Sequence, residues 1–272
     1  MSSDPSKRVL LHYREQARKH GLSSKSTMED DVARDKETQL IEHFIRVTAG
    51  LQSRPRRVLD AGCGNAFTLE RLALAAPQDE HWGVDASIDM LAVGIRRPAA
   101  RRLAVGSAQS LPFAAPSFDV VVSQRCLINI LDWDGQREAL AEIARILRPG
   151  GFFLMIEGFE DGLRSNNQAR RECGLEELRP AHHNLYFEKS ILFAELGRWF
   201  RLVEPQELDP DQPDRLASNF LSSHYFVARV LYAALNKGEW VRNAEVMRFF
   251  SFLPPLGNYS PIQAFLLRRE DL

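Results

Sequence analysis

The sequence predicts an α/β fold: a doubly wound, mostly parallel sheet with helices on both faces. Three observations predict it. Segments of strand length alternate with segments of helical period, residues 118–124 carry a continuous apolar stretch, and a glycine-containing turn (VLDAGCGNA, 58–66) follows an early strand. Repeated strand–helix units favour a parallel sheet. A continuous apolar stretch is typical of a strand that is buried on both faces of such a sheet.

The composition is that of an ordinary globular protein with no marked charge. Of 272 residues, 44% are hydrophobic and 26% charged, and 35 Lys and Arg balance 36 Asp and Glu. The balance gives no pull toward nucleic acid. No apolar run reaches the ~18 residues of a membrane span, and MSSDPSKR does not resemble a signal peptide, so we expect a cytoplasmic protein. An odd number of distant cysteines argues against a disulfide framework or a cysteine zinc site: Cys63, Cys126 and Cys173.

The first fifty residues predict a lid and a helix. Residues 1–34 are polar with scattered apolar positions, and we expect a short helix and a loop that fold over a bound ligand, with Tyr13 and Arg34 as contacts. From Asp35 onward, apolar residues recur at helical spacing, which predicts an amphipathic helix over 35–51.

Strands and helices then alternate. We expect strands over 57–61, 81–85, 102–106, 118–124 and 152–157, and helices over 67–76, 87–95 and 134–147. The last of these helices ends at Arg148-Pro149-Gly150-Gly151, where Pro and Gly cannot continue it.

The last third of the chain is less regular. We expect a polar connection over 158–187, a helix over 188–200, a sixth strand over 201–208 and a final strand over 262–269. The excursion between those two strands is too long for a plain connection, and such insertions are usually functional. The predicted organisation is therefore a lid (1–34), a ligand-binding core (35–209), a helical cap insertion (210–256) and the final core strand (257–272).

The turn after the first strand is the first candidate for a site. Asp60 is followed by Gly62 and Gly64, and glycines adopt backbone angles closed to other residues and let a ligand approach the main chain. A plain strand-to-helix turn would use the same residues. Asp85, however, ends the second strand, where an acid can accept two hydrogen bonds from ribose hydroxyls.

Downstream, GSAQSLPF (106–113), FDVVVSQ (118–124) and LRPGG (147–151) follow in order. In this order the pieces resemble the class I S-adenosylmethionine (SAM)-dependent methyltransferases, especially the group that acts on small molecules. The resemblance covers about 58–157. It implies a Rossmann-like, seven-stranded sheet with a reversed final hairpin, and SAM lying across the carboxyl ends of the strands. A nicotinamide dinucleotide is the rival ligand for the glycine turn, and the absence of a long second βαβ half argues against it.

The resemblance implies a cofactor site of eight residues: Asp60, Gly62, Gly64, Asp85, Ser107, Ala108, Ser123 and Gln124. In it, the glycine backbone would face the methionine part of SAM, and Asp60 would hold the loop and the amino group. Asp85 would bind the ribose. Ser107 and Ala108 would lie at the adenine edge, with Ile88 or a nearby apolar residue against its face.

Ser123 and Gln124 would border the sulfonium. Two positions depart from the family pattern. Ala66 replaces the third glycine of the loop, and Ser107 replaces an Asp, so we expect weaker adenine selectivity.

A hydroxyl acceptor needs a base, and the candidates lie past the fifth strand. Glu157 ends that strand, and His182 and His183 lie in the segment RPAHHNLYF. Polar residues nearby could hydrogen-bond an acceptor: Arg164, Asn166, Asn167, Arg170 and Tyr186, with His224 and Tyr225 on the cap. The paired carboxylates and the Asp/Asn spacing of catechol-type metal sites are absent, so we expect no required metal. Glu157, Glu160 and Asp161 could still hold Mg²⁺, but a solvated acidic loop would use the same residues.

The sequence therefore predicts a SAM-dependent methyltransferase that acts on a small polar acceptor, a hydroxyl of a sugar-like or natural-product substrate. N-methylation of a small amine stays open, and so does a SAM-binding subunit without turnover. We expect a small-molecule or glycan partner, no nucleic acid and no membrane span, and a homodimer is left open.

Overall fold

One seven-stranded sheet organises the chain. The computed structural model describes residues 5–51, 55–238, 243–250 and 252–270. The strand order is β3-β2-β1-β4-β5-β7-β6. The strands are β1 (Arg57–Ala61), β2 (Glu80–Asp85), β3 (Leu103–Val105), β4 (Phe118–Gln124), β5 (Leu147–Gly158), β6 (Phe200–Leu202) and β7 (Ile262–Arg269). The first five run parallel, and β7 is antiparallel to β5 and β6. The predicted doubly wound, mostly parallel sheet with a reversed final hairpin is confirmed.

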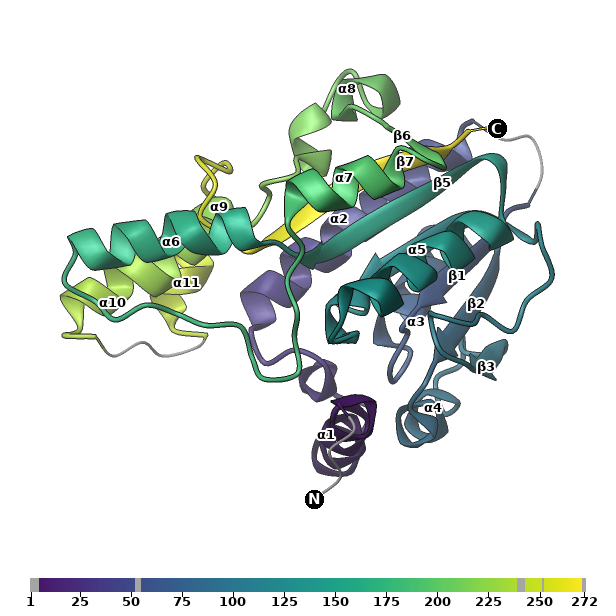
Figure 1. The fold of residues 1–272 in the computed structure, drawn as a ribbon, viewed down its shortest axis with the longest axis horizontal. Coiled ribbons are helices and arrows are strands. Elements are labelled where there is room, and N and C mark those ends of the chain that lie inside the picture. Colours follow the sequence, from purple (N-terminus) through teal and green to yellow (C-terminus); the bar gives the residue numbers. More distant parts are fainter. Residues whose placement is uncertain (1–4, 52–54, 239–242, 251, 271–272) are drawn as a thin grey trace.

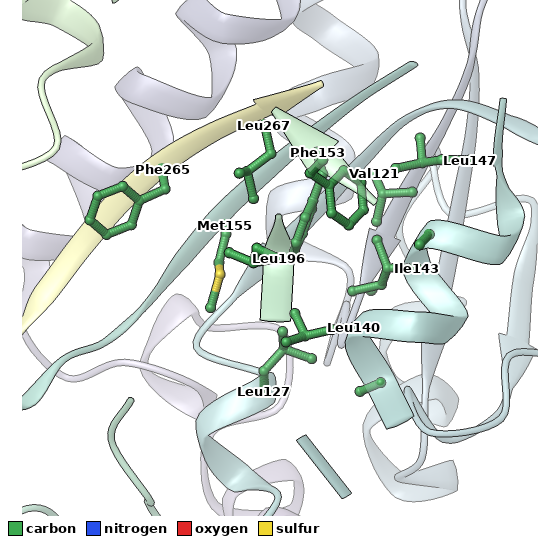
Figure 2. Packing of buried hydrophobic residues seen from close by; sticks show 14 of the residues in the cluster. Val121, Leu127, Leu140, Ile143, Leu147, Phe153, Met155, Leu196, Phe265 and Leu267 are labelled. Carbon is green, nitrogen blue, oxygen red and sulfur yellow. The ribbon is translucent and has the colours of Figure 1, made fainter. Parts of the chain in front are cut away.

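The core has two halves because side chains alternate across the strands. In β4, Val121 points to one face, while Val120 and Val122 belong to the cluster on the other. Phe153 and Met155 of β5 share the face of Val121, where they pack with α5 (Trp133–Ile146) and α7 (Lys189–Leu196), as Figure 2 shows. The opposite face packs against α2 (Asp31–Ala49) and α3 (Phe67–Ala75).

The N-terminal segment and the cap lie at the carboxyl ends of the strands. The N-terminal helix α1 (Pro5–His20) lies beside α4 (Ile88–Gly94), and η1 (Ser24–Ser26) joins it to α2 (Figure 1). Between β6 and β7, the chain forms η3 (Pro213–Leu216), α9 (Ser222–Phe226), a π-helical turn η4 (Val227–Leu231), α10 (Tyr232–Leu235) and α11 (Glu245–Phe250). The last elements gather next to α6 (Glu160–Glu172) at one end of the molecule.

Two predicted elements are wrong. The predicted connection over 158–187 contains α6, whose inward face is polar and therefore shows no apolar period. Asn166 donates from Nδ2 to Tyr259 O at 2.8 Å, and Arg170 donates from Nε to Glu176 O at 2.6 Å. The predicted strand over 201–208 is short, since β6 ends at Leu202.

The chain then forms α8 (Pro205–Leu208). Proline suits the first turn of a helix, and Glu204 and Glu207 form a capping box. At the other end of the core, α2 begins at Asp31, four residues before the predicted start, because Asp30 caps it by accepting from Ala33 N at 3.0 Å.

Arg56 holds α2 to the edge of β1. Its side chain is 1% exposed. It donates to Asp79 Oδ2 at 2.9 Å, to Thr48 Oγ1 at 2.7 Å and to Ile45 O at 2.9 Å. Each nitrogen of the guanidinium is thus hydrogen-bonded, and the group is the counter-ion of a buried carboxylate.

We predict that Arg56→Met lowers the free energy of unfolding by about 3–5 kcal/mol, because the change leaves Asp79 charged, buried and unpaired. Urea unfolding followed by circular dichroism measures this. Arg102→Met is the matched control: Arg102 Nη2 lies 3.8 Å from Glu80 Oε1 in an exposed pair, and its loss should cost less than about 1 kcal/mol. Equal losses for the two variants would contradict the role given to Arg56.

Candidate cofactor and active site

A cavity of about 610 Å³ lies at the carboxyl ends of β1, β2 and β4. Its wall includes seven of the eight residues predicted to hold the cofactor: Asp60, Gly62, Gly64, Asp85, Ser107, Ala108 and Gln124. Ser123 is fully buried and does not line the cavity, although its neighbour Gln124 does. Ile88 is 66% exposed and does not contribute to the lining. The residues assigned on the family pattern therefore come together around one space.

The glycine turn is shaped by contacts within the protein. Gly62 has φ +80°, and a Cβ there would lie 2.4 Å from Cys126 Sγ. Gly62 N and Cys63 N both donate to Val84 O, at 2.8 and 3.0 Å, which locks the turn to β2. Ala66 has φ 59°, in the left-handed region that the family fills with glycine. An alanine there costs roughly 1–2 kcal/mol.

Asp85 holds the two loops together. Its Oδ2 accepts from Gly64 N at 2.8 Å, and its Oδ1 accepts from Ser87 N at 2.7 Å. A carboxylate has about four acceptor sites, so each oxygen keeps capacity for a ligand. Burial raises the pKa of this carboxyl group despite the two hydrogen bonds.

Two buried groups of opposite charge on the cavity wall each keep one atom without a partner. Asp60 is 1% exposed, and its Oδ2 has no hydrogen-bond partner among the described residues. Burial, with a contribution from Asp85, raises the pKa of Asp60 to about 7, although the nearby charge of Arg34 acts in the opposite direction. Arg34 is 4% exposed, and its Nε is likewise unpartnered in the described part of the chain. Both residues line the cavity, so a ligand with an ammonium and a carboxylate would complement their charges.

Behind the cavity runs a charged network that the sequence reasoning missed. Glu37, on α2, is fully buried and accepts from Gln124 Nε2 at 2.7 Å and from Arg125 Nε at 3.0 Å. Arg125 follows β4 with φ 52°, an unfavourable angle for a non-glycine residue, and it lines the cavity. An arginine directly after a strand, at the edge where ligands bind, was the available signal for this residue.

The three predicted catalytic residues are not on the cavity wall. Glu157 is fully buried, and its oxygens accept from the backbone N–H groups of Cys126 (3.1 Å), Leu127 (3.1 Å) and Ile128 (3.2 Å). Burial raises the pKa of Glu157 to about 7. The geometry favours a structural role, holding the turn after β4.

His182 and His183 contact the N-terminal helix instead. The ring of His183 stacks on that of His12, with centroids 4.2 Å apart. Neither loop histidine is in the lining of the cavity.

The other acceptor candidates lie nearer the cap. Asn167 is bonded to the backbone of Leu178, and Arg164 lies 3.1 Å from Glu188. Tyr186 packs its ring on Gly158 at the end of β5. His224 Nε2 lies 3.0 Å from Asp30 Oδ2, which joins the cap to the start of α2.

Within the described ranges, no group of three or more His, Cys, Asp or Glu side chains is arranged to hold a metal ion. Nor does any described helix have the length and apolar character needed to cross a membrane.

Comparison with known proteins finds similarity over part of the core. A family model described as a methyltransferase domain matches residues 58–151. Over 105 residues the chain is 35% identical to a ubiquinone/menaquinone C-methyltransferase of Syntrophotalea carbinolica, a match that covers 37% of this chain and 43% of the relative. A demethylmenaquinone methyltransferase of Thermus thermophilus is 34% identical over 115 residues, or 41% of this chain and 51% of the relative. The chain thus spans about half the length of the relatives that it matches.

Similarity over the whole length comes from structure. The plantazolicin methyltransferase BpumL, solved with S-adenosylhomocysteine, superposes with a TM-score of 0.54 at 12% identity, covering 98% of both chains. This likeness concerns the fold.

We predict that Asp60→Asn stabilises the ligand-free protein at pH 8. The folded-state pKa is about 7, against ~3.9 in an unfolded chain, so above pH 7 folding buries a charged carboxylate with a partnerless oxygen. Removing that charge should raise the free energy of unfolding by about 1–3 kcal/mol. At pH 5 the folded protein already holds Asp60 protonated, so the gain should be less than half as large.

Urea unfolding at both pH values measures the gain. Asp79→Asn is the matched control, because the Asp79 carboxylate is equally buried but bonded to Arg56, and its replacement should destabilise at pH 8. An Asp60→Asn variant that is less stable than the parent at pH 8 would contradict the partnerless carboxylate.

Proposed function

We propose that this chain, whose residues 58–151 form a class I methyltransferase domain, is a SAM-dependent methyltransferase that acts on a hydroxyl of a small polar acceptor, sugar-like or a natural product. The observation that carries the proposal is the pair of oppositely charged buried groups on one cavity wall, Asp60 and Arg34, each with one unpartnered atom among the described residues. SAM supplies a methyl group on a sulfonium and carries an α-amino acid at one end.

The residues present fit that molecule. Asp60 Oδ2 can accept from an ammonium, and Arg34 Nε can donate to a carboxylate, so the amino acid end of SAM would satisfy both buried groups. Asp85 is the acid for the ribose hydroxyls. Ser107 and Ala108 form the part of the wall proposed to face the adenine. Ser107 offers a hydroxyl there, where the family pattern has the carboxylate of an aspartate.

The acceptor is not determined by the family match. The matched segment, residues 58–151, carries most of the cavity wall. Outside it, α1 and the start of α2 line the cavity, whereas no described residue of α6 or of 210–256 does.

A second candidate is C-methylation of a quinone precursor. Its support is the identity of 34–35% to proteins named as quinone methyltransferases. The third and fourth candidates are N-methylation of a small amine and a SAM-binding subunit without turnover. S-adenosylhomocysteine release with sugar-like, phenolic, amine and quinol acceptors separates all four, since the subunit produces none with any acceptor.

We predict that two substitutions separate the two ends of the donor. Arg34→Gln should weaken S-adenosylhomocysteine binding at least tenfold, because a charge-assisted hydrogen bond contributes roughly 1.5–3 kcal/mol. The same variant should bind 5′-methylthioadenosine, which lacks the amino acid end, as the parent does. Asp85→Ala should weaken both ligands, since both carry the ribose. Calorimetry measures the four affinities.

Methylthioadenosine is the internal control for the fold of each variant. Equal losses of both ligands in Arg34→Gln would contradict the assignment of Arg34 to the carboxylate. Unchanged S-adenosylhomocysteine affinity in Asp85→Ala would contradict the assignment of Asp85 to the ribose.

The base for a hydroxyl acceptor stays a prediction. A general base contributes ~10²–10⁴-fold and must reach the acceptor within a hydrogen bond. Because neither loop histidine is on the cavity wall, we now expect His182→Asn/His183→Asn to change kcat by less than about tenfold, below that factor. Steady-state kinetics with an accepted substrate measures it. A loss of a hundredfold or more, with unchanged SAM affinity, would restore a histidine as the base.

A further inference from the structure

The N-terminal helix forms part of the cavity wall and is attached at two places. Ser6, Val9, Leu10 and Tyr13 of α1 line the cavity. On one side, α1 packs beside α4, where Arg14 Nε lies 3.9 Å from Asp89 Oδ1 in an exposed pair.

On the other side α1 contacts residues 182–184. Tyr13 donates its hydroxyl to Asn129 Oδ1 at 2.7 Å, and Asn129 Nδ2 donates to Asn184 Oδ1 (2.8 Å) and to His183 O (3.1 Å). Next to this chain of hydrogen bonds, the rings of His12 and His183 are stacked, with an interplanar angle of 23°. The ring of His182 lies 6.2 Å from that of His12 and 5.0 Å from that of His183, edge-on to both.

We propose that His12 and His183, with His182 edge-on to both, form a latch that holds α1 closed over the cavity while the His12 and His183 rings are neutral and releases it when they are protonated. The inference rests on the proposed function only in naming SAM as the ligand beneath α1. A stack of two rings at 4.2 Å with a third edge-on suits neutral imidazoles, whereas two imidazolium ions at that distance repel each other.

The charges around the rings support this reading. Burial, then His12 and His182, lowers the pKa of His183 to about 4. Burial and His182 lower the pKa of His12, and Glu15, on the same helix, acts in the opposite direction. Tyr13 is a further titratable group in contact, with its ring 6.4 Å from that of His183. Glu15 thus opposes the lowered pKa of His12, whereas the charged groups that act on His183 are the other two imidazoles.

The direction in which pH changes the stability of the closed state follows from the lowered pKa values of His12 and His183. In the open state a histidine titrates near ~6.5, so closure has its full stability above that pH and loses it as the pH falls below. For His183 alone, the equilibrium constant for closure should be about 30-fold smaller at pH 5.0 than at pH 7.5. In mildly acidic conditions α1 is open more often, so ligand should enter the cavity more readily and also leave it more readily.

Hydrogen exchange of the α1 amides in the ligand-free protein tests the latch. Working without ligand keeps the readout separate from Asp60, whose pKa burial raises to about 7. After correction for intrinsic exchange rates, the protection of α1 should fall at least tenfold between pH 7.5 and 5.0, while that of α3 stays within threefold. His12→Phe/His183→Phe keeps two stacked rings without a titratable group and should keep α1 protected at pH 5.0.

His20→Phe is the matched control, because His20 is on the same helix and makes no ring contact with His182 or His183 within the described residues. It should behave as the parent. Protection of α1 that does not depend on pH in the parent, or an equal fall in the double variant, would overturn the latch.

If the double variant leaves α1 unprotected even at pH 7.5, His182→Asn decides. Without the third ring, the protection of the α1 amides should fall less between pH 7.5 and 5.0 than it does in the parent. A fall as large as in the parent would overturn the latch. The proposed function is tested by a different experiment, calorimetry with S-adenosylhomocysteine at pH 7.5, and absence of binding would contradict it. The latch is tested by the exchange data alone.

Discussion

The site depends on a carboxyl group that is buried at the end of β1 with one oxygen lacking a partner among the described residues. Burying such a group in its charged form costs free energy, which protonation or a ligand that donates to it relieves. The Asp60 oxygen shares its cavity wall with the Nε of Arg34, which is unpartnered in the same part of the chain. A single zwitterionic group relieves both costs, and we regard this as the physical basis for selecting the amino acid end of the donor.

The position of Arg34 links that constraint to distant parts of the chain. Arg34 lies in the first turn of α2, and Asp30 caps this helix. Asp30 is in turn bonded to His224 of the cap. Behind it, Glu37 binds both Gln124 and Arg125, so α2 is joined to the residues that follow β4. The cap and the cavity wall therefore share one helix, a physical route by which movement of the cap can affect ligand binding.

Much of the fold could be predicted from residues that alternate or recur at fixed spacing. The strands β1, β4 and β7 have the predicted ends because their apolar runs are bounded by polar or glycine residues. Helix α6 could not be found in this way, since Asn166 and Arg170 on its inward face bond to backbone carbonyls instead of packing in an apolar core.

The residues proposed to hold the donor could be brought together from the sequence because they match a family pattern in which each follows the end of a strand. The acceptor side was not, because it depends on how segments far apart in the sequence meet. The adjacent His182 and His183 looked like bases near a pocket, and only the fold places them against His12. Arg125 has no pattern of its own, and its strained backbone is visible only in three dimensions.

A crystal structure of the protein with S-adenosylhomocysteine tests the central claim most directly. Our account predicts the homocysteine ammonium within hydrogen-bond distance of Asp60 Oδ2, its carboxylate on Arg34 Nε and the ribose hydroxyls on Asp85. A ligand bound in the reverse orientation, or one that leaves both Asp60 Oδ2 and Arg34 Nε without a partner, would contradict it.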